Sequence, residues 1–334
     1  MAEMELRRPK CQLCELLWEV AWRNGKGRLG SVRFEREQSW LKMDGNTRPV
    51  LWICRGNGRC GARGWFTRRG RSSLIFAAGA NPRIESEVYQ GLCELPEAGG
   101  QAHLSIVNKW LRFCDEFHPN CRGSASSGRC MPTRVIDVGD AGSEFIRLWE
   151  PSQGARLPYV ALSHPWGKGP HFVTDASNRD QRKKGIRLGD LPNTFRDAVL
   201  ATRAINIRYL WIDSICIVQG PGGDFDVEAK SMECVFSSAY VVLAASRSRN
   251  QNDGFLGQRP RRNYVTLFDG ETPFYVCEFI DNFKHDVLDS HLNQRGWVLQ
   301  EHALARRTVF FAGPQTYFEC GDGVRCETLT KMRK

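Results

Sequence analysis

The chain has 334 residues, of which 41% are hydrophobic and 25% are charged, as in an average soluble protein. This composition supports a packed core and argues against global disorder. No apolar run approaches the ~20 residues that span a bilayer. The charged first ten residues lack the apolar core of a secretory signal. We therefore expect an intracellular, cytoplasmic protein without a membrane segment.

Much of the net charge of +10 lies in two basic runs. Runs of this kind contact nucleic acid or anionic ligands in some proteins. No nucleic-acid-binding motif accompanies them here, so we interpret them as solvated loops and do not expect a nucleic-acid partner. The residues are Arg55, Arg59, Arg63, Arg68, Arg69 and Arg71 in the first run, and Arg179, Arg182, Lys183, Lys184 and Arg187 in the second.

Residues 1–130 form a region rich in Cys, Arg and Gly, for which we predict mainly irregular structure. Apolar residues at helical spacing predict one helix around residues 13–20 and another around residues 104–111. Residues 131–158 follow as a lead-in to the next region. Within them, two short alternating runs are separated by Gly-Asp-Ala-Gly, which predicts a β-hairpin at residues 134–149.

The pattern changes at residue 159, where apolar runs begin to alternate with helical periods. The runs at residues 159–163, 209–212 and 241–245 predict strands that are buried on both faces. Helical periods at residues 192–206 and 225–239 separate them. This alternation implies right-handed crossovers and a parallel sheet covered by helices on both sides, so the fold class is α/β.

The predicted domain core ends near residue 301, and residues 302–334 are its C-terminal continuation. Residues 308–311 are apolar throughout and could add one more strand. The chain stops soon afterwards, so we expect this continuation to be short or truncated.

Four segments in this order resemble the heterokaryon incompatibility (HET) domain of filamentous fungi. They are Tyr-Val-Ala-Leu-Ser-His-Pro-Trp-Gly at residues 159–167, the stretches 191–219 and 224–239, and Arg-Gly-Trp-Val-Leu-Gln-Glu at residues 295–301. Upstream, Cys114, His118 and Cys121, followed by the run 131–138, resemble the lead-in common to these proteins. One block alone would be weak, whereas four in order are specific. Pro165, and Phe225 where the family tends to have Trp, depart from the pattern.

The resemblance implies a signalling protein of non-self recognition that ends in growth arrest or programmed cell death. Its partners would be a second copy of the chain or another incompatibility protein. The resemblance also implies a TIR-like, Rossmann-like sheet beside the irregular N-terminal region. Because some TIR domains cleave NAD, the alternative function is an NAD glycohydrolase, with NAD as its substrate. A nucleic-acid-binding protein is a second alternative.

Polar residues follow the predicted strands at the sheet edge where open α/β proteins bind ligands. Ser163 and His164 end the first strand, Trp166 lies in the following turn, and Asp213 ends the second strand. Asp224 begins a helix whose N-terminus favours a phosphate or carboxylate. These five residues are our candidates for a ligand cleft, although His164 before Pro165 fits a turn residue better than a base.

Glu228 is the candidate catalytic residue. The Asp-Phe-x-x-Glu arrangement at residues 224–228 resembles the aromatic-x-x-Glu of NAD-cleaving TIR domains, in which that Glu is catalytic. One carboxylate near the ribose can stabilise the positive charge that develops as neutral nicotinamide leaves. The alternative is that Glu228 only interacts with the positive end of its helix.

Arg295, Trp297 and Glu301 form a further polar cluster. Arg295 and Glu301 could pair across a helix start, and we interpret the three residues as a structural latch. No Ser-His-acid triad, phosphate-binding lysine loop or dinucleotide glycine pattern is evident.

The cysteines suggest a zinc site. Cys11-x2-Cys14 and Cys114-x3-His118-x2-Cys121 have the spacing of zinc ligands and supply five candidates for four positions. The alternative is that these cysteines are ordinary small residues of the two predicted helices. In an intracellular protein, cysteines are expected as thiols or ligands, and the odd total of 13 argues against a complete disulfide framework.

Overall fold

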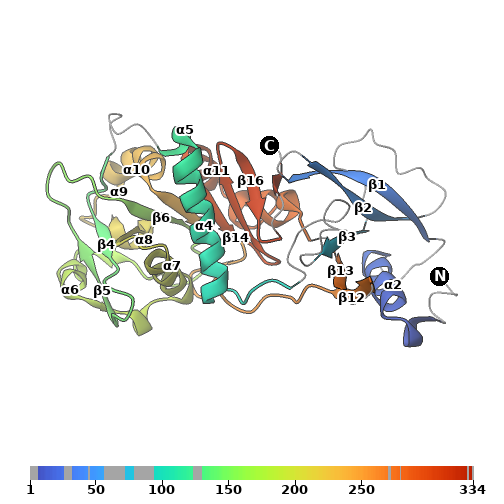
Figure 1. Ribbon diagram of the computed structural model, residues 1–334. Helices are drawn as coiled ribbons and strands as arrows, with labels where there is room; N and C mark the ends of the chain where they lie inside the picture. Colours follow the sequence, from blue (N-terminus) through green and yellow to red (C-terminus); the bar gives the residue numbers. More distant parts are fainter. Residues whose placement is uncertain are drawn as a thin grey trace. The chain divides into compact units, whose positions relative to one another are not determined.

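The computed structural model describes residues 7–25, 32–43, 46–55, 72–78, 94–122, 130–269, 272–278, 280–328 and 331–332 (Figure 1). The chain divides into two compact units. Unit 1 comprises residues 1–95, 261–281 and 326–333, and unit 2 comprises residues 96–260, 282–325 and 334. Among the helices described, none is long and apolar enough to cross a membrane.

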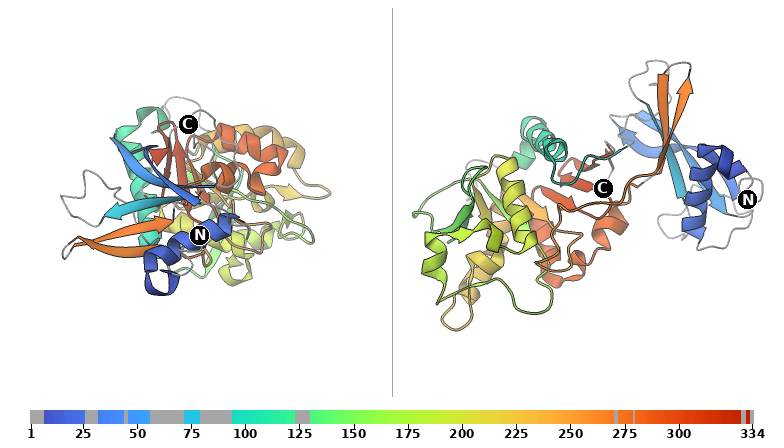
Figure 2. Two further views of the ribbon diagram at one scale, coloured as in Figure 1. Left: turned by 90° about the vertical axis from the view of Figure 1, so that its right-hand side faces the viewer. Right: turned by 90° about the horizontal axis from the view of Figure 1, so that it is seen from below.

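Unit 1 is built on a five-stranded antiparallel sheet with the order β1-β2-β3-β13-β12 (Figure 2). Its elements are η1 (Arg8–Lys10), α2 (Gln12–Gly25), β1 (Val32–Met43), β2 (Asn46–Arg55), β3 (Ser72–Ala78), β12 (Tyr264–Asp269), β13 (Thr272–Glu278) and the short β17 (Lys331–Met332). Helix α2 confirms the first predicted helix. The prediction of irregular structure is wrong for β1, β2 and β3. Only Val32 and Phe34 alternate before a polar run in β1, so its period-two signal is too short to detect.

Unit 2 contains a large mixed sheet in which β16-β15-β14-β11-β6-β9-β4-β5-β8 are successive neighbours. The four central strands run parallel: β14 (Thr308–Phe311), β11 (Val241–Ala244), β6 (Tyr159–Ser163) and β9 (Tyr209–Trp211). The antiparallel neighbours are β15 (Thr316–Cys320) beside β14, and then β4 (Val135–Asp137), β5 (Phe145–Trp149) and β8 (Ile186–Arg187) beyond β9; β16 (Gly323–Cys326) follows β15. The predicted strands, the hairpin and the α/β class are confirmed, but the sheet is parallel only at its centre.

Helices cover both faces of this sheet. α7 (Asn193–Ala204) connects β6 to β9, α10 (Met232–Ser238) connects β9 to β11, and α11 (Gly296–Leu304) precedes β14. Because β9 and β11 lie on opposite sides of β6, right-handed crossovers place α7 on one face and α10 and α11 on the other. α4 (Gln101–Phe117) packs against α7 and β15, whereas α10 packs against α11. Helices α4 and α7 confirm two predicted helices.

The predicted helix at residues 225–239 is broken into α9 (Phe225–Glu228), η3 (Ala229–Ser231) and α10. The remaining short elements are α5 (Pro119–Arg122), β7 (Thr174–Asp175), α6 (Arg179–Lys184), η2 (Leu188–Asp190), α8 (Asp213–Cys216), β10 (Val218–Gln219), the π-helical turn η4 (Lys284–Leu288) and η5 (Leu292–Gln294). β7 and β10 form a separate parallel pair.

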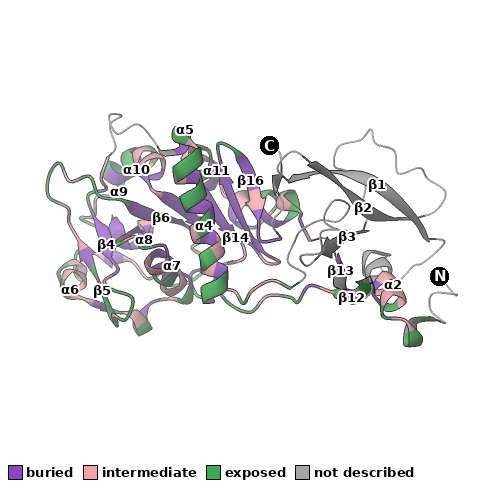
Figure 3. Cartoon of the chain, viewed as in Figure 1, coloured by how far each residue is buried: buried purple, intermediate pink, exposed green. Residues whose placement is uncertain are grey.

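The core of unit 2 lies around the central strands (Figure 3). Every residue of β6, β11 and β14 is buried. This pattern is expected where helices cover both faces of a parallel sheet, since no side chain then meets solvent. The apolar interior leaves the strand ends as the places where polar side chains can gather.

Candidate functional site

The strand order of unit 2 reverses at β6. The chain moves from β6 to β9 on one side and then to β11 on the other. The connection after β6 therefore crosses one face of the sheet. The connections after β9 and after β11 cross the other face. In open α/β sheets, a reversal of this kind opens a crevice at the carboxyl ends of the strands, where ligands bind. Ser163 is the last residue of β6 and lies at this point.

A hydrogen-bonded polar network occupies the carboxyl ends of β6 and β9. Nε2 of His164 lies 3.1 Å from Oδ1 of Asp213. The indole Nε1 of Trp166 donates to Oδ2 of the same carboxylate at 2.8 Å, and the backbone N–H of Ser214 donates to Oδ1 at 2.7 Å. The network joins three of the candidates expected to share a cleft, and Ser163 enters it through another partner.

Both ring nitrogens of His164 lie close to oxygen atoms. Nδ1 lies 3.2 Å from the carbonyl oxygen of Pro165, and Nε2 faces Asp213. Contacts on both sides of the ring therefore fix the orientation of the imidazole. The ring is buried and packs edge-on against Phe195. His164 therefore connects the loop after β6 to Asp213 through a buried contact.

The pKa of Asp213 is lowered by this network. Burial alone would raise it, but the charge of His164 and the hydrogen bonds from His164, Trp166 and the Ser214 amide outweigh that cost. The carboxylate is ionised at neutral pH, and its hydrogen bonds link the loop after β6 to the start of α8.

The predicted latch residues complete the same network from α11. Oγ of Ser163 donates to Oε2 of Glu301 at 2.5 Å, and Nη1 of Arg295 donates to the carbonyl oxygen of His164 at 2.6 Å. Arg295 and Glu301 were expected to pair with each other, but these hydrogen bonds go to the end of β6. The side chain of Trp297 lies outside the described part of the chain.

Glu301 has a strongly perturbed pKa. Burial raises it to about 7, against a smaller lowering by the hydrogen bond from Ser163. The negative charge of Asp213 raises it further, whereas the positive charges of His164 and Arg295 lower it. Such a carboxyl group changes its ionisation near neutral pH, a property often found at functional sites.

Two further hydroxyl groups lie at the same edge of the sheet. Ser214 follows β9 and Ser246 follows β11, and both side chains are buried. Neither hydroxyl has a hydrogen-bond partner among the described residues. Buried hydroxyls of this kind favour a bound water or a ligand atom at the strand ends.

Asp224 and Glu228 lie in a second group, around Arg134. The guanidinium group forms an ion pair with Asp224, and its Nη2 lies 3.9 Å from Oε1 of Glu228. Nε of Arg134 also donates to the carbonyl oxygen of Cys216 at 2.6 Å. The helical pattern predicts that Phe225 is buried and that Glu228 lies at the edge of the buried face. In the structure, Glu228 is buried and Phe225 is half exposed. The reason is that the two carboxylates turn toward the buried arginine.

The structure brings three of the five predicted zinc ligands together and adds one that was missed. The thiols of Cys114, Cys121 and Cys320 and the imidazole of His118 have ligand atoms within 4.8 Å of one another. Cys11 and Cys14 are not part of this group. They belong to unit 1, where the Cys14 amide donates to the Cys11 sulfur at 3.3 Å.

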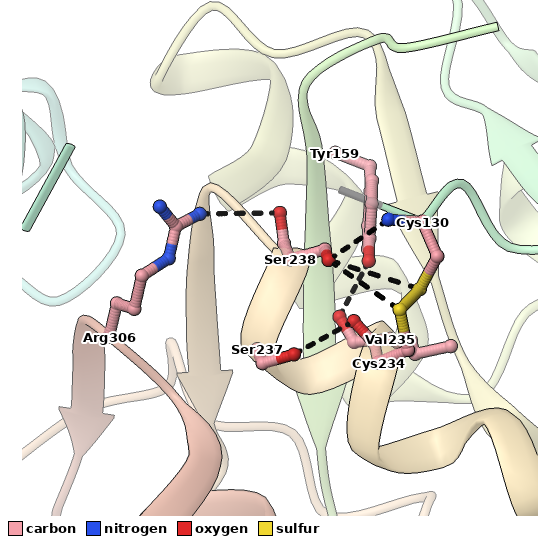
Figure 4. The surroundings of a disulfide bond; sticks show 7 residues. All are labelled: Cys130, Tyr159, Cys234, Val235, Ser237, Ser238 and Arg306. Carbon is pink, nitrogen blue, oxygen red and sulfur yellow. Dashed lines mark hydrogen bonds between the residues drawn. A yellow bond between two sulfur atoms is a disulfide. The ribbon is translucent and has the colours of Figure 1, made fainter. Parts of the chain in front are cut away.

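A pocket of about 250 Å3 lies at the opposite, amino-terminal edge of the central strands. Tyr159 and Tyr240 line it together with Arg306 and Arg307. Near it, Cys130 and Cys234 form a disulfide, as Figure 4 shows. The expectation that the cysteines are thiols or ligands is therefore wrong for this pair. The cysteines of the two predicted zinc-ligand motifs, and Cys320, are free. None of the candidate cleft residues lines this pocket.

Several residues of the second basic run have local partners. Arg179 and Lys183 bind Glu150 at 2.6 and 2.7 Å, and Arg182 stacks on the ring of Phe172. Of the first run, residues 59–71 and the side chain of Arg55 lie outside the described part of the chain.

Comparison with known protein families identifies the segment that carries the network. The model of the heterokaryon incompatibility protein (HET) family matches residues 159–301. The resemblance to the HET family is thereby confirmed over this segment. Neither a curated protein nor a solved structure matches the chain.

Three of the four sequence blocks in the HET segment meet in the polar network. Its first block supplies Ser163 and His164, its second supplies Asp213, and its last supplies Arg295 and Glu301. Three blocks that are far apart in the sequence thus form one buried network. The third block, with Asp224 and Glu228, instead meets Arg134 of the lead-in.

Proposed function

We propose that this chain is a HET-type signalling protein of non-self recognition, located in the cytoplasm, whose output is growth arrest or cell death. The HET match over residues 159–301 carries the proposal. The burial of the polar network supports it. Ser163, His164 and Glu301 are each less than one-tenth exposed and are bonded to other protein groups. These contacts suit residues that hold α11 on the sheet.

The mode of action in this proposal is association through α9 with a second copy or with another incompatibility protein. Phe225 and Val227 on this helix are 50% and 67% exposed. Burying both against a partner would remove apolar surface from water and stabilise the complex. Asp224 and Glu228 anchor the same helix to Arg134, so its apolar side chains are presented on a fixed backbone.

The double substitution Phe225→Ser with Val227→Ser is expected to weaken association roughly 10–100-fold, because two buried apolar contacts are lost. Sedimentation over a range of concentrations measures this change. Induced expression in a filamentous fungus, scored by surviving colonies, measures the output, and the double variant is expected to restore growth.

Leu200→Ser is the matched control, since Leu200 is 40% exposed but lies on α7. It should leave association and growth arrest unchanged. A wild-type chain that arrests growth as a monomer would contradict association, and a wild-type chain that never arrests growth would contradict the signalling function itself.

Glu228 motivates a second candidate function, the cleavage of NAD. Its carboxylate is turned inward and lies near a cationic group that could also attract a phosphate. The side chain is only 8% exposed, so α9 would have to move before a ribose could reach it. Association through α9 could supply that movement.

Glu228→Gln is expected to reduce nicotinamide release from NAD by about 100-fold or more, because the charge that stabilises the transition state is lost. Release is followed in concentrated protein, under conditions in which the chain associates. Asp226→Asn is the matched control, since Asp226 is an exposed acid on the same helix. Equal release by wild type and Glu228→Gln, or none by either, counts against the enzyme.

A further inference from the structure

Three sulfur atoms and one imidazole nitrogen converge on a single point in unit 2. Cys114 lies in the last turn of α4, His118 directly follows that helix, Cys121 lies in α5, and Cys320 ends β15. All four ligand atoms are within 4.8 Å of one another. The three cysteines are buried, with exposed fractions of 0%, 5% and 3% in chain order.

The spacing of these atoms matches a tetrahedral metal site. Zinc binds thiolates at about 2.3 Å and imidazole nitrogen at about 2.0–2.1 Å, so the edges of the tetrahedron are about 3.5–3.8 Å. Nδ1 of His118 lies 3.4 Å from Sγ of Cys320, close to such an edge. The remaining distances need to contract by no more than about 1 Å to reach this geometry.

We propose that Cys114, His118, Cys121 and Cys320 bind one structural zinc ion. Soft sulfur ligands with a single imidazole select zinc over hard cations such as calcium or magnesium. Four protein ligands close the coordination shell and leave no position for water. The site therefore stabilises the fold and takes no part in hydrolysis. This inference is independent of the proposed signalling function.

The residues around the cluster have the arrangement that supports a zinc ligand. Nδ1 of His118 faces the sulfurs, while Nε2 lies 3.3 Å from Oδ2 of Asp322. A carboxylate on the outer nitrogen fixes the tautomer and orientation of a ligating histidine. The backbone N–H of Asp322 donates to the Cys320 sulfur at 3.5 Å, which stabilises a thiolate.

The chain after β15 is shaped to approach the cluster closely. Gly321 follows Cys320, and a Cβ atom at this position would lie 3.3 Å from Sγ of Cys121. A larger residue would therefore crowd the sulfurs. Arg325 binds Asp322 at 3.2 Å and holds the outer carboxylate in place.

The site would join parts of unit 2 that are distant in sequence. His118 and Cys320 are 202 residues apart, and the HET segment lies between them. A metal that closes so long a loop restricts the unfolded chain strongly and so stabilises the folded state. Ordinary core cysteines would explain burial, but they do not require an imidazole nitrogen beside three sulfurs.

The test is the metal content of the purified full chain, produced with zinc in the medium. We expect one zinc per chain in the wild type and loss of zinc in Cys320→Ala. Asp322→Asn should keep the ligands but weaken zinc binding about 10–100-fold. Cys216→Ala and Cys11→Ala are the matched controls, because Cys216 is equally buried and Cys11 has the alternative predicted spacing; both should retain zinc.

Cobalt replacement keeps the proposal testable if Cys320→Ala does not fold. The wild-type chain loaded with cobalt should show the sulfur-to-metal charge-transfer band and the intense visible bands of a tetrahedral thiolate site. A folded wild-type chain without zinc, and without these cobalt bands, overturns the proposal. A disulfide between Cys114 and Cys320 in that protein, detected by mass spectrometry, overturns it as well.

Discussion

Replacing Arg134 by Met is expected to lower the free energy of unfolding by about 3–5 kcal/mol. Arg134 is only 4% exposed, and it forms an ion pair with Asp224 and lies 3.9 Å from Glu228. It also donates to the carbonyl oxygen of Cys216 at 2.6 Å. The substitution leaves the buried carboxylate of Glu228 without its positive neighbour and the carbonyl without this donor. Breaking a buried pair from one side costs more than the pair itself contributes.

Urea unfolding of the two proteins measures this difference. Arg208→Met is the matched control, since Arg208 is about half exposed and shares Asp137 with Arg147. Its loss should cost less than about 1 kcal/mol. Adding Glu228→Gln to Arg134→Met should recover part of the stability, because the uncompensated charge is removed. A loss of less than about 1 kcal/mol in Arg134→Met would show that the cluster does not stabilise the fold.

The central sheet could be predicted from the sequence because its strands are buried on both faces. The run Tyr159–Ser163 is apolar up to its final serine, and every one of its residues is buried. Such runs, separated by helical periods, have few alternative interpretations. The unit 1 strands were missed for the opposite reason, since β1 contains five charged residues among its twelve and shows no sustained apolar pattern.

The polar network could be predicted only in part. Ser163, His164 and Asp213 follow buried strands, and parallel strands bring their carboxyl ends to one edge. Glu301 lies on a helix 138 residues beyond Ser163, and no local pattern in the sequence says which strand end it will face. Long-range contacts of this kind depend on the packing of α11, which periodicity does not specify.

The missed residues illustrate the same limit. Cys320 is separated by about two hundred residues from the other members of its cluster, so spacing could not connect it to them. The residues directly after it, Gly321-Asp322-Gly323, indicate a turn but do not indicate a metal ligand. Helix α9 shows a different limit: helical periodicity favoured burial of Phe225, but pairing with Arg134 turned Glu228 inward instead.

Glu301→Gln is expected to stabilise the protein above pH 7 and to flatten its pH dependence. Burial raises the pKa of Glu301 to about 7 from an ordinary value of 4.5. The folded state therefore binds this proton more tightly than the unfolded chain does. The resulting stabilisation is fully present below about pH 4.5, falls as the pH rises, and is lost above about pH 7. Glutamine keeps an oxygen to accept from Ser163 but cannot ionise.

The difference between the two pKa values sets the size of the effect. Above pH 7, the free energy of unfolding of Glu301→Gln should exceed that of the wild type by on the order of 3 kcal/mol at most. The groups that face Glu301 remain in the variant: Ser163, Asp213, His164 and Arg295. The difference between the two stability curves therefore reports the carboxyl group of Glu301 together with its coupling to these neighbours.

Urea unfolding from pH 5 to pH 8 measures the two curves. Glu144→Gln is the matched control, because the Glu144 side chain is 74% exposed and should leave the curve unchanged. The two proteins should differ least at pH 5, diverge as the pH rises toward 7, and keep a nearly constant difference above it. A constant difference across this range would mean that Glu301 is already ionised at acid pH, and that the positive charges of Arg295 and His164 outweigh its burial. In that case the contact between α11 and Ser163 would be an ordinary charged hydrogen bond. A widening difference would instead identify the end of β6 as a contact that loosens when the pH rises.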